Sequence, residues 1–421
     1  MKKVTSLLLL FPLITLTLPV GCLKDTCTHT YSYTWFEPVY KTVAEVRAGI
    51  LSRPAAAIKA PGKLFMKGNY IFLNELNKGV HIIDNTNPAT PINKAFIEIP
   101  GNVDIAVKGN TLYADLYTDL VVMDISNPEN VKTKKFVDNI FPERFYGFHY
   151  DRSKIIFEWK RHDTTIAQNC GTQDNPWTVF ANDGVMVASE NISGNKAFSG
   201  GSPTGIAGSM ARFALVNNYL YTAGEADLKT FDISNPENPV AAGNTRLGWG
   251  IETIFPFKNH LFIGSKTGML IYNIDNPASP AASGSFSHAR VCDPVIAEDD
   301  VAFVTLRDGS ECMGFLNELN VVDIRNLAAP VLLKKYNMTN PHGLSKDGDY
   351  LFICDGRDGL KIYNAADVNN IHLIRRIAMP DTYDVIAWNG LALVVAKDGL
   401  YQFDYSNINN IRELSKISVA D

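Results

Sequence analysis

Leu120-Val-Val-Met-Asp-Ile-Ser-Asn-Pro128 decides the fold, because the chain repeats this stretch. A second strong copy is Leu228-Lys-Thr-Phe-Asp-Ile-Ser-Asn-Pro236. Each copy begins with residues typical of a β-strand, in which successive side chains point to opposite faces. The Ser-Asn-Pro ending predicts a turn, because Ser and Asn side chains bond to nearby backbone and Pro fixes its own φ. Each copy is therefore one strand and the turn that ends it.

Weaker copies share an acid or amide at the end of the strand. These anchor residues are Asp84, Asp124, Asp232, Asn273, Asp323, Asn364 and Asp404. The step between them is about 40 residues, apart from one longer step of about 50 and one of 108, which we interpret as a degenerate unit plus an insertion. Within 103–137, a strand precedes the hairpin signal Gly109-Asn110, and three more strands follow it. Four antiparallel strands, a to d, in about 40 residues are typical of a propeller blade.

The hairpin turns between strands a and b give the number of units. They fall near 68, 109, 151, 217, 258, 299, 347 and 389. We therefore predict an all-β fold, an eight-bladed β-propeller over residues 61–421. Seven blades are the alternative, if the first unit or the degenerate third unit forms no full blade. A linear β-solenoid fits the four-strand units less well.

The N-terminus is a targeting segment. Lys2 and Lys3 precede an apolar stretch at 7–20 that is too short for a comfortable membrane span. The ending Leu18-Pro-Val-Gly-Cys22 resembles a bacterial lipobox, which implies removal of residues 1–21 and a lipid on Cys22. A plain signal peptide with an incidental Cys is the alternative. Residues 22–60 are expected to be a polar tether, to about 35, and a lead-in with a short helix at 43–50.

Charge and cysteine content restrict the other possibilities. The net charge of −5 gives no reason to expect a nucleic-acid partner. Without Cys22, an odd number of cysteines remains: Cys27, Cys170, Cys292, Cys312 and Cys354. At least one thiol is therefore free or paired unexpectedly. No zinc-type spacing occurs, so we expect no metal site, and Cys354 lies in a strand b as a small buried apolar residue.

Three connections are longer than the repeat requires: 161–176, 191–208 and 307–318. In a propeller the b–c and d–a connections lie on one face, and the a–b and c–d turns lie on the other. All three long connections are b–c or d–a connections in the eight-unit alignment. That face is therefore the expected binding face, because insertions gather where function needs or tolerates them.

Aligning the units on strand b predicts a ring of polar side chains at the mouth of the channel. Its members are Lys63, Asp104, Tyr146, Arg212, Glu252, Asp293, His342 and Asp384. Such a ring is a candidate site for a cation or for a polar ligand such as a sugar or peptide. The alternative is that these side chains have a structural role. The acids would then accept hydrogen bonds from backbone N–H groups, and oppositely charged neighbours would pair with one another. The common hydrolase and nucleotide-binding motifs are absent, and we assign no catalytic residue.

Cys292 and Cys312 are expected on that same face. Cys292 precedes Asp293, and Cys312 lies in the long connection 307–318. A disulfide between them would hold this connection to the channel rim and stabilise the fold by roughly 3 kcal/mol. Two unpaired thiols are the alternative.

The repeated Leu-Val-Val-Met-Asp-Ile-Ser-Asn-Pro resembles the LVIVD repeat of bacterial surface propellers, over about 61–418. The resemblance implies the fold and supplies no catalytic residues. We expect a monomeric, non-enzymatic scaffold without a cofactor. A lipid on Cys22 would anchor it in the cell envelope, in the outer membrane, facing either the periplasm or the outside. Its partner would be a protein, peptide or glycan. A glycan-acting hydrolase or lyase using the acidic ring and His342 is the alternative.

Overall fold

The computed structural model describes residues 28–144, 154–169, 186–187, 206–288, 294–308 and 316–420. The chain divides into two compact units. Residues 39–158 and 191–421 form the propeller unit, and residues 1–38 and 159–190 form the ribbon unit. None of the helices in the described ranges has the length and apolar character that crossing a membrane requires.

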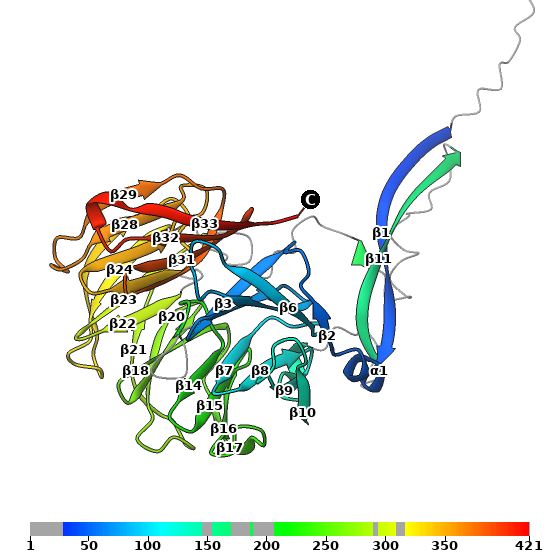
Figure 1. Cartoon of the computed structure of the whole chain (residues 1–421), viewed down its shortest axis with the longest axis horizontal. Coiled ribbons are helices and arrows are strands. Elements are labelled where there is room, and N and C mark those ends of the chain that lie inside the picture. The colour runs from blue at the N-terminus through cyan, green and yellow to red at the C-terminus, as the bar shows by residue number, and fades with distance from the viewer. Residues whose placement is uncertain are drawn as a thin grey trace, which may run out of the picture. The chain divides into compact units, whose positions relative to one another are not determined.

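Within the described residues the propeller unit holds seven four-stranded blades (Figure 1). Blade 1 is β3 (Pro61–Lys67), β4 (Tyr70–Glu75), β5 (Gly79–Asp84) and β6 (Ile92–Glu98). Blade 2 is β7 (Ile105–Lys108), β8 (Thr111–Leu116), β9 (Asp119–Asp124) and β10 (Lys132–Val137). Blade 3 is β14 (Phe213–Val216), β15 (Tyr219–Ala223), β16 (Asp227–Asp232) and β17 (Val240–Arg246).

The remaining blades follow one another in sequence. Blade 4 is β18 (Ile251–Phe257), β19 (His260–Ser265), β20 (Gly268–Asn273) and β21 (Ala281–Ser287). Blade 5 is β22 (Val295–Glu298), β23 (Val301–Leu306), β24 (Glu318–Asp323) and β25 (Val331–Asn337). Blade 6 is β26 (Leu344–Asp347), β27 (Tyr350–Cys354), β28 (Leu360–Asn364) and β29 (His372–Ile377). Blade 7 is β30 (Thr382–Trp388), β31 (Leu391–Ala396), β32 (Gly399–Asp404) and β33 (Arg412–Ser418).

The anchor residue ends each strand c through a short local bond. The Oδ1 atom of Asp124 accepts the backbone N–H of Ser126 at 2.9 Å. In all seven units the side-chain oxygen of the anchor residue accepts the backbone N–H of the residue two positions later. The anchors are Asp84, Asp124, Asp232, Asn273, Asp323, Asn364 and Asp404. Asn makes it as well as Asp because an amide oxygen is also an acceptor. The sequence repeat therefore corresponds to the same hydrogen-bonded turn, which occurs once in each of the seven blades.

A backbone bond confirms which loops share a face. The N–H of Ile125, in a c–d turn, donates to the carbonyl of Asn110, in the a–b turn of the same blade. The corresponding bond recurs in the other blades, as from Ile233 to Asn218. The c–d and a–b turns therefore lie on one face, as predicted, and the b–c and d–a connections lie on the other.

The prediction of eight blades was wrong at the third unit. Residues 154–169, interpreted as strand b of that unit and the start of a loop, form one long strand, β11 (Lys154–Asn169). β11 lies in a three-stranded sheet of order β11-β1-β12 with β1 (Thr28–Thr42) and β12 (Met186–Val187). This stretch has no anchor turn, so nothing local ends the strand. Residues 161–169 are therefore no b–c loop, and 170–176 lie outside the described residues.

The lead-in segment differs in part from the expected tether. Residues 28–35 belong to β1. The expected short helix is present as α1 (Val43–Ala48), and Thr42 caps it in a capping box with Glu45. β2 (Leu51–Pro54) then pairs with β6 at the edge of blade 1. Two short 3-10 turns, Pro142–Arg144 and Ile408–Asn410, complete the described elements.

The blades close into a ring without exchanging strands. The innermost strands contact one another in the order β3, β7, β14, β18, β22, β26, β30 and back to β3. Blades 1 and 7 share a buried apolar cluster that includes Leu64 and Leu393. The side-chain amides of Asn85 and Gln402, both buried, exchange two hydrogen bonds of 2.7 and 2.9 Å across this junction. Side-chain packing and this amide pair help to close the ring, together with the bond from the Ser415 hydroxyl to the carbonyl of Pro88 at 2.6 Å.

Candidate functional site

The segment that leads into blade 3 crosses the centre of the ring. β13 (Ile206–Ala207) pairs with β3 of blade 1. The hydroxyl of Ser209 accepts the N–H of Leu344 in blade 6 at 2.7 Å, and the carbonyl of Ala211 accepts the N–H of Ile254 in blade 4 at 2.6 Å. We call residues 206–211 the crossing segment. Because 208–211 are buried among the inner strands of several blades, the crossing segment fills the channel at this level.

The crossing segment was not predicted. From the sequence, 191–208 was identified only as a long connection on the b–c and d–a face. The sequence did contain a signal that this segment would be buried, because four of its residues are small or apolar: Ile206, Ala207, Met210 and Ala211. The rest of the long connection, 191–205, lies outside the described residues.

Two predicted ring residues form a buried ion pair. The Lys63 ammonium lies 2.5 Å from Oδ2 of Asp104, and their side chains are 3% and 0% exposed. Oδ1 of Asp104 also accepts the backbone N–H of Arg212 at 3.3 Å. The Arg212 guanidinium itself donates to the carbonyl of Ile251 at 2.9 Å. Lys63, Asp104 and Arg212 are thus brought together, as the predicted ring requires. The Lys63 and Asp104 side chains are buried and do not line an open channel mouth.

Asp384 is buried directly against the crossing segment. A Cβ atom added to Gly208 would stand 2.0 Å from its Oδ2, and one added to Gly343 would stand 2.1 Å from its Oδ1. The carboxyl is therefore held between two glycines, where no larger residue fits. Burial raises its pKa to about 7, although the N–H groups of Val385 and Ser209 and the charge of Lys63 act in the opposite direction.

This raised pKa predicts a specific dependence of stability on pH. An unfolded Asp titrates near 3.8, so between about pH 4 and 7 the folded protein holds the proton more tightly. Stability is therefore lost as pH rises through this window. Asp384→Asn cannot ionise and avoids this loss. From pH 5 to 8 we expect its free energy of unfolding to gain roughly 2 kcal/mol relative to wild type. Urea unfolding of both proteins at several pH values checks this, and parallel pH curves would contradict it.

His342 is also enclosed by polar partners. Arg307 Nη1 lies 2.8 Å from its Nδ1, and its Nε2 lies 2.9 Å from Oδ1 of Asn340. Arg307 Nη1 also lies 3.1 Å from Nε2, and because an Arg side chain only donates, the ring is the acceptor in the contact with Arg307. Tyr383 packs edge-on against the ring at 5.8 Å. These contacts enclose the imidazole, which is buried.

Of the remaining ring members, the structure describes one. Glu252 is buried at the start of β18. Tyr146 and Asp293 lie outside the described residues, as do Cys22, Cys292 and Cys312, so the lipidation and the disulfide remain predictions. Cys354 is buried, as predicted, and its thiol is free. No group of three or more metal-ligating His, Cys, Asp or Glu side chains occurs in the described ranges.

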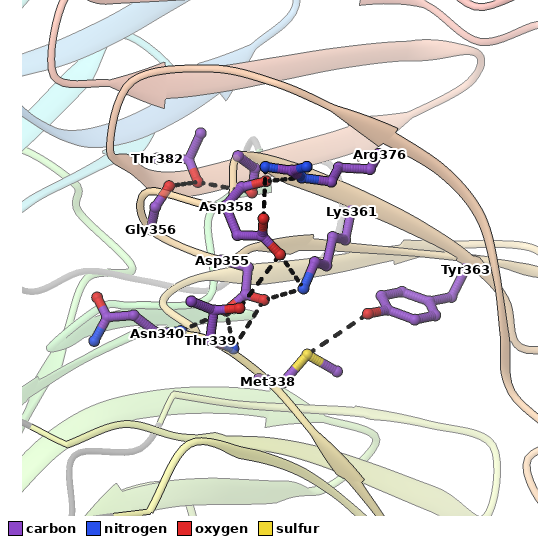
Figure 2. A network of polar contacts seen from close by, with 11 residues as sticks. Met338, Thr339, Asn340, Asp355, Gly356, Asp358, Lys361, Tyr363, Arg376 and Thr382 are labelled. Atoms are coloured by element: carbon purple, nitrogen blue, oxygen red, sulfur yellow. Dashed lines mark hydrogen bonds and ion pairs between the residues drawn. The ribbon is translucent and has the colours of Figure 1, made fainter.

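Acids at the ends of strands b hold the d–a connections in place. In blade 6, Oδ1 of Asp355 accepts the N–H groups of Thr339 and Asn340 at 3.0 and 2.7 Å. Figure 2 shows Lys361 reaching both Asp355 and Asp358, at 2.5 and 2.6 Å. This network fixes the backbone just before His342.

The same clamp recurs in blades 1 and 2. Oδ1 of Asp115 accepts the N–H groups of Val103 and Asp104, both at 2.8 Å. The carboxylate of Glu75 accepts those of Lys59 and Ala60. Sequence alignment missed this role, although an acid at the end of an apolar strand b was a visible signal. The clamps fix the backbone at 59–60, 103–104 and 339–340, on the b–c and d–a face.

Trp249 is the most exposed large apolar side chain on the described surface, at 72%. It lies in the connection from β17 to β18, between Gly248 and Gly250, which adopt positive φ angles of 110° and 80°. The N–H of Gly250 donates to the carbonyl of Glu225 at 3.0 Å, and the carbonyl of Gly250 accepts the N–H of Lys266 at 2.9 Å. The indole is therefore presented to solvent from a fixed backbone on the b–c and d–a face. Our sequence interpretation missed it, although Gly-Trp-Gly in a loop was a visible signal.

Comparison with known proteins agrees with the repeat. The model of the LVIVD repeat matches residues 62–96, 101–138, 207–246 and 312–338. The first three matches lie on blades 1, 2 and 3, and the last lies on the outer strands of blade 5. Curated proteins contain no match to the sequence.

Solved structures share the architecture at low sequence identity. The computationally designed Ika8 protein gives a TM-score of 0.51 at 10% identity, over 86% of this chain and 90% of that one. A protein from Lactobacillus plantarum gives 0.50 at 11% identity, over 78% and 87%. BamB from Moraxella catarrhalis gives 0.50 at 8% identity, over 87% and 98%. These similarities concern the fold alone. The repeat matches and the blades together show that the chain carries LVIVD repeats and that it folds as a β-propeller.

Proposed function

We propose that this protein is a non-enzymatic binding scaffold of the bacterial cell envelope. A lipid on Cys22 anchors it, and the b–c and d–a face contacts a protein, peptide or glycan. One of the three predicted long connections supports this face as the binding face. The connection between β23 and β24 does lie on it, although residues 309–315 are outside the described ranges.

The exposed indole of Trp249 carries the proposal. Tryptophan is enriched at the energetic centres of interfaces because it buries a large area and orders few rotatable bonds. Exposing such a side chain between two glycines with positive φ has no benefit for the fold. Glu225 and Lys266 hold its backbone, so little conformational entropy is lost when a ligand covers the ring.

The buried polar groups support binding rather than catalysis. A glycosidase needs two carboxyl groups open to substrate, about 5–10 Å apart. Asp104 is occupied by Lys63, and Asp384 is covered by Gly208. The glycan-acting hydrolase or lyase has no comparable observation in its favour.

The test is a glycan and peptide binding screen on the processed chain, residues 22–421, carrying Ser in place of Cys22. Trp249→Ala is expected to lower the affinity for a partner found in the screen by roughly 30-fold, which corresponds to about 2 kcal/mol of binding free energy. Trp388→Ala is the matched control, because Trp388 is also exposed but lies at the a–b turn of blade 7, on the other face. Equal losses from both variants, or none from Trp249→Ala, would contradict the proposal.

Anchoring is tested separately in cells. The wild-type chain should incorporate radiolabelled palmitate and sediment with membranes. Cys22→Ser should incorporate none. Label in the Cys22→Ser variant, or no label in wild type, would remove the anchor from the proposal.

A further inference from the structure

A small cavity lies between blades 4 and 5, on the a–b and c–d face of the propeller. Its volume is about 140 Å³, and its lining comes from the a–b turns of both blades, from β19 and from the c–d turn of blade 5. Every lining residue belongs to the described ranges. Trp249 lies on the opposite face, so this cavity is distinct from the proposed binding face.

The inner part of the cavity is apolar. Phe262 and Ile324 are buried and belong to the apolar cluster that joins blades 4 and 5. Phe257 and Leu327 are partly buried against the same cluster. The rings of Phe257 and Phe262 are tilted by 59°, with centroids 6.3 Å apart. The cavity has room for about one six-membered ring, since an apolar cavity of roughly 150 Å³ binds benzene.

The two preceding blade junctions place a hydroxyl group at the corresponding position. Tyr113 of blade 2 and Tyr221 of blade 3 each donate a hydrogen bond to the carbonyl of a Pro in the c–d turn of the next blade, at 2.8 and 3.1 Å. The residue of blade 4 that corresponds to these tyrosines is Phe262, and the residue of blade 5 that corresponds to the Pro is Leu327. Phe262 has no hydroxyl that could reach the Leu327 carbonyl. Because both residues line the cavity, the missing hydroxyl leaves part of this space open.

The rim of the cavity is charged, and its cations are already engaged. Lys258 Nζ donates to the carbonyl of Asp299 at 3.0 Å, and Arg325 Nε lies 2.9 Å from Oδ2 of Asp323. Among the described residues, the carboxylates of Asp299 and Asp300 accept no hydrogen bond and form no ion pair. The charge of Asp300 also acts on Arg325, but less strongly than the hydrogen bond from Asp323 does. These five side chains carry two positive and three negative charges, so the rim is acidic by one charge.

His260 adds no positive charge to this rim at neutral pH. Burial lowers the pKa of its imidazole, although the charge of Asp275 acts in the opposite direction. The ring therefore stays neutral at pH 7 and does not repel a cation. A positively charged ligand thus matches the cavity better than a negatively charged one.

We propose that this cavity binds a small organic cation, with one ring-sized apolar group between Phe257, Phe262 and Leu327 and an ammonium group at the acidic rim. The apolar group gains by leaving water for the surface of these side chains. The ammonium group donates hydrogen bonds to the carboxylates of Asp299 and Asp300, and such charge-assisted bonds are stronger than neutral ones. The inference depends neither on the lipid nor on the b–c and d–a face.

The experiment is a titration of the processed Cys22→Ser chain with benzylamine, followed by ligand-detected NMR. We expect a Kd of about 1 mM, because the ligand is small, and binding of benzoate that is roughly tenfold weaker or more. Asp300→Asn should lower the affinity for benzylamine roughly fivefold. Phe262→Tyr should lower it at least about tenfold, because the new hydroxyl occupies the cavity and donates to the Leu327 carbonyl. This variant copies the two preceding junctions, so it tests the site without loss of folding.

A matched control for the acidic rim is Asp349→Asn. Asp349 holds the same position in the a–b turn of blade 6 as Asp300 does in blade 5, since each backbone carbonyl accepts an N–H from the c–d turn of its own blade. Asp349→Asn should leave benzylamine binding unchanged. Equal losses from the two Asp variants, unaltered binding by Phe262→Tyr, benzoate binding as tight as that of benzylamine, or no benzylamine binding would each overturn the proposal. Trp249→Ala should have no effect here, so a failure of this site and a failure of the proposed binding face are distinguishable.

Discussion

Lys63→Ala is expected to lower the free energy of unfolding by about 3–5 kcal/mol. The substitution removes the cation that lies 2.5 Å from Asp104 and leaves this fully buried carboxylate without its charged partner. The charge of Lys63 also opposes the raised pKa of Asp384, so its loss makes a second buried carboxyl harder to ionise. Urea unfolding at pH 7, followed by circular dichroism, measures the change.

Arg53→Ala is the matched control for this variant. Arg53 pairs with Glu98 at 3.0 Å, but the two side chains are 52% and 37% exposed. Exposed ion pairs contribute about 0–1 kcal/mol because water screens them. The Asp104→Asn change added to Lys63→Ala should recover part of the loss, since a neutral amide is easier to bury. A cost below about 1 kcal/mol for Lys63→Ala would show that the pair is not buried as described.

Gly208→Ala is expected to displace the crossing segment and to cost roughly 2–4 kcal/mol. The new Cβ would stand 2.0 Å from Oδ2 of Asp384, far inside van der Waals contact. The carboxyl has no room to move away from the new Cβ, because Gly343 lies close to its other oxygen. Displacing the segment withdraws the Ser209 hydroxyl from the N–H of Leu344 and the Ala211 carbonyl from the N–H of Ile254. Native-state hydrogen exchange should therefore accelerate at these two amides.

A second substitution tests the cause of this effect. Asp384→Ala removes the carboxyl that Gly208→Ala would strike, so the double variant should be more stable than the sum of the two losses predicts. Such coupling between contacting residues is measured by a double-mutant cycle. Additive losses, or unchanged exchange at Leu344 and Ile254, would show that Gly208 does not hold the segment in the channel.

Local chemistry explains what was predictable. The anchor bond of Asp124 to Ser126 joins residues two apart, and it forms wherever the motif occurs. The alternation of strands, the hairpin signals and the faces of the loops follow from similarly short-range rules. The fold class and the positions of seven blades could therefore be derived without any tertiary information. Cys354 was also placed correctly, because an apolar strand b is buried in every blade.

Contacts between distant residues decided the rest. Residues 154–159 alternate like a blade strand, but their partner is β1, more than 100 residues earlier, and this removed the eighth blade. Asp104 and Asp384 were identified as inner-strand acids, but their burial depends on Lys63 and on the crossing segment. The position of Trp249 depends on backbone hydrogen bonds that join Gly250 to Glu225 and Lys266 in neighbouring loops. The sequence by itself determined the turn and its repetition, since each bond lies within a few residues. The tertiary structure decided which polar groups are enclosed and which side chains stay exposed, because those depend on residues that meet only when the ring closes.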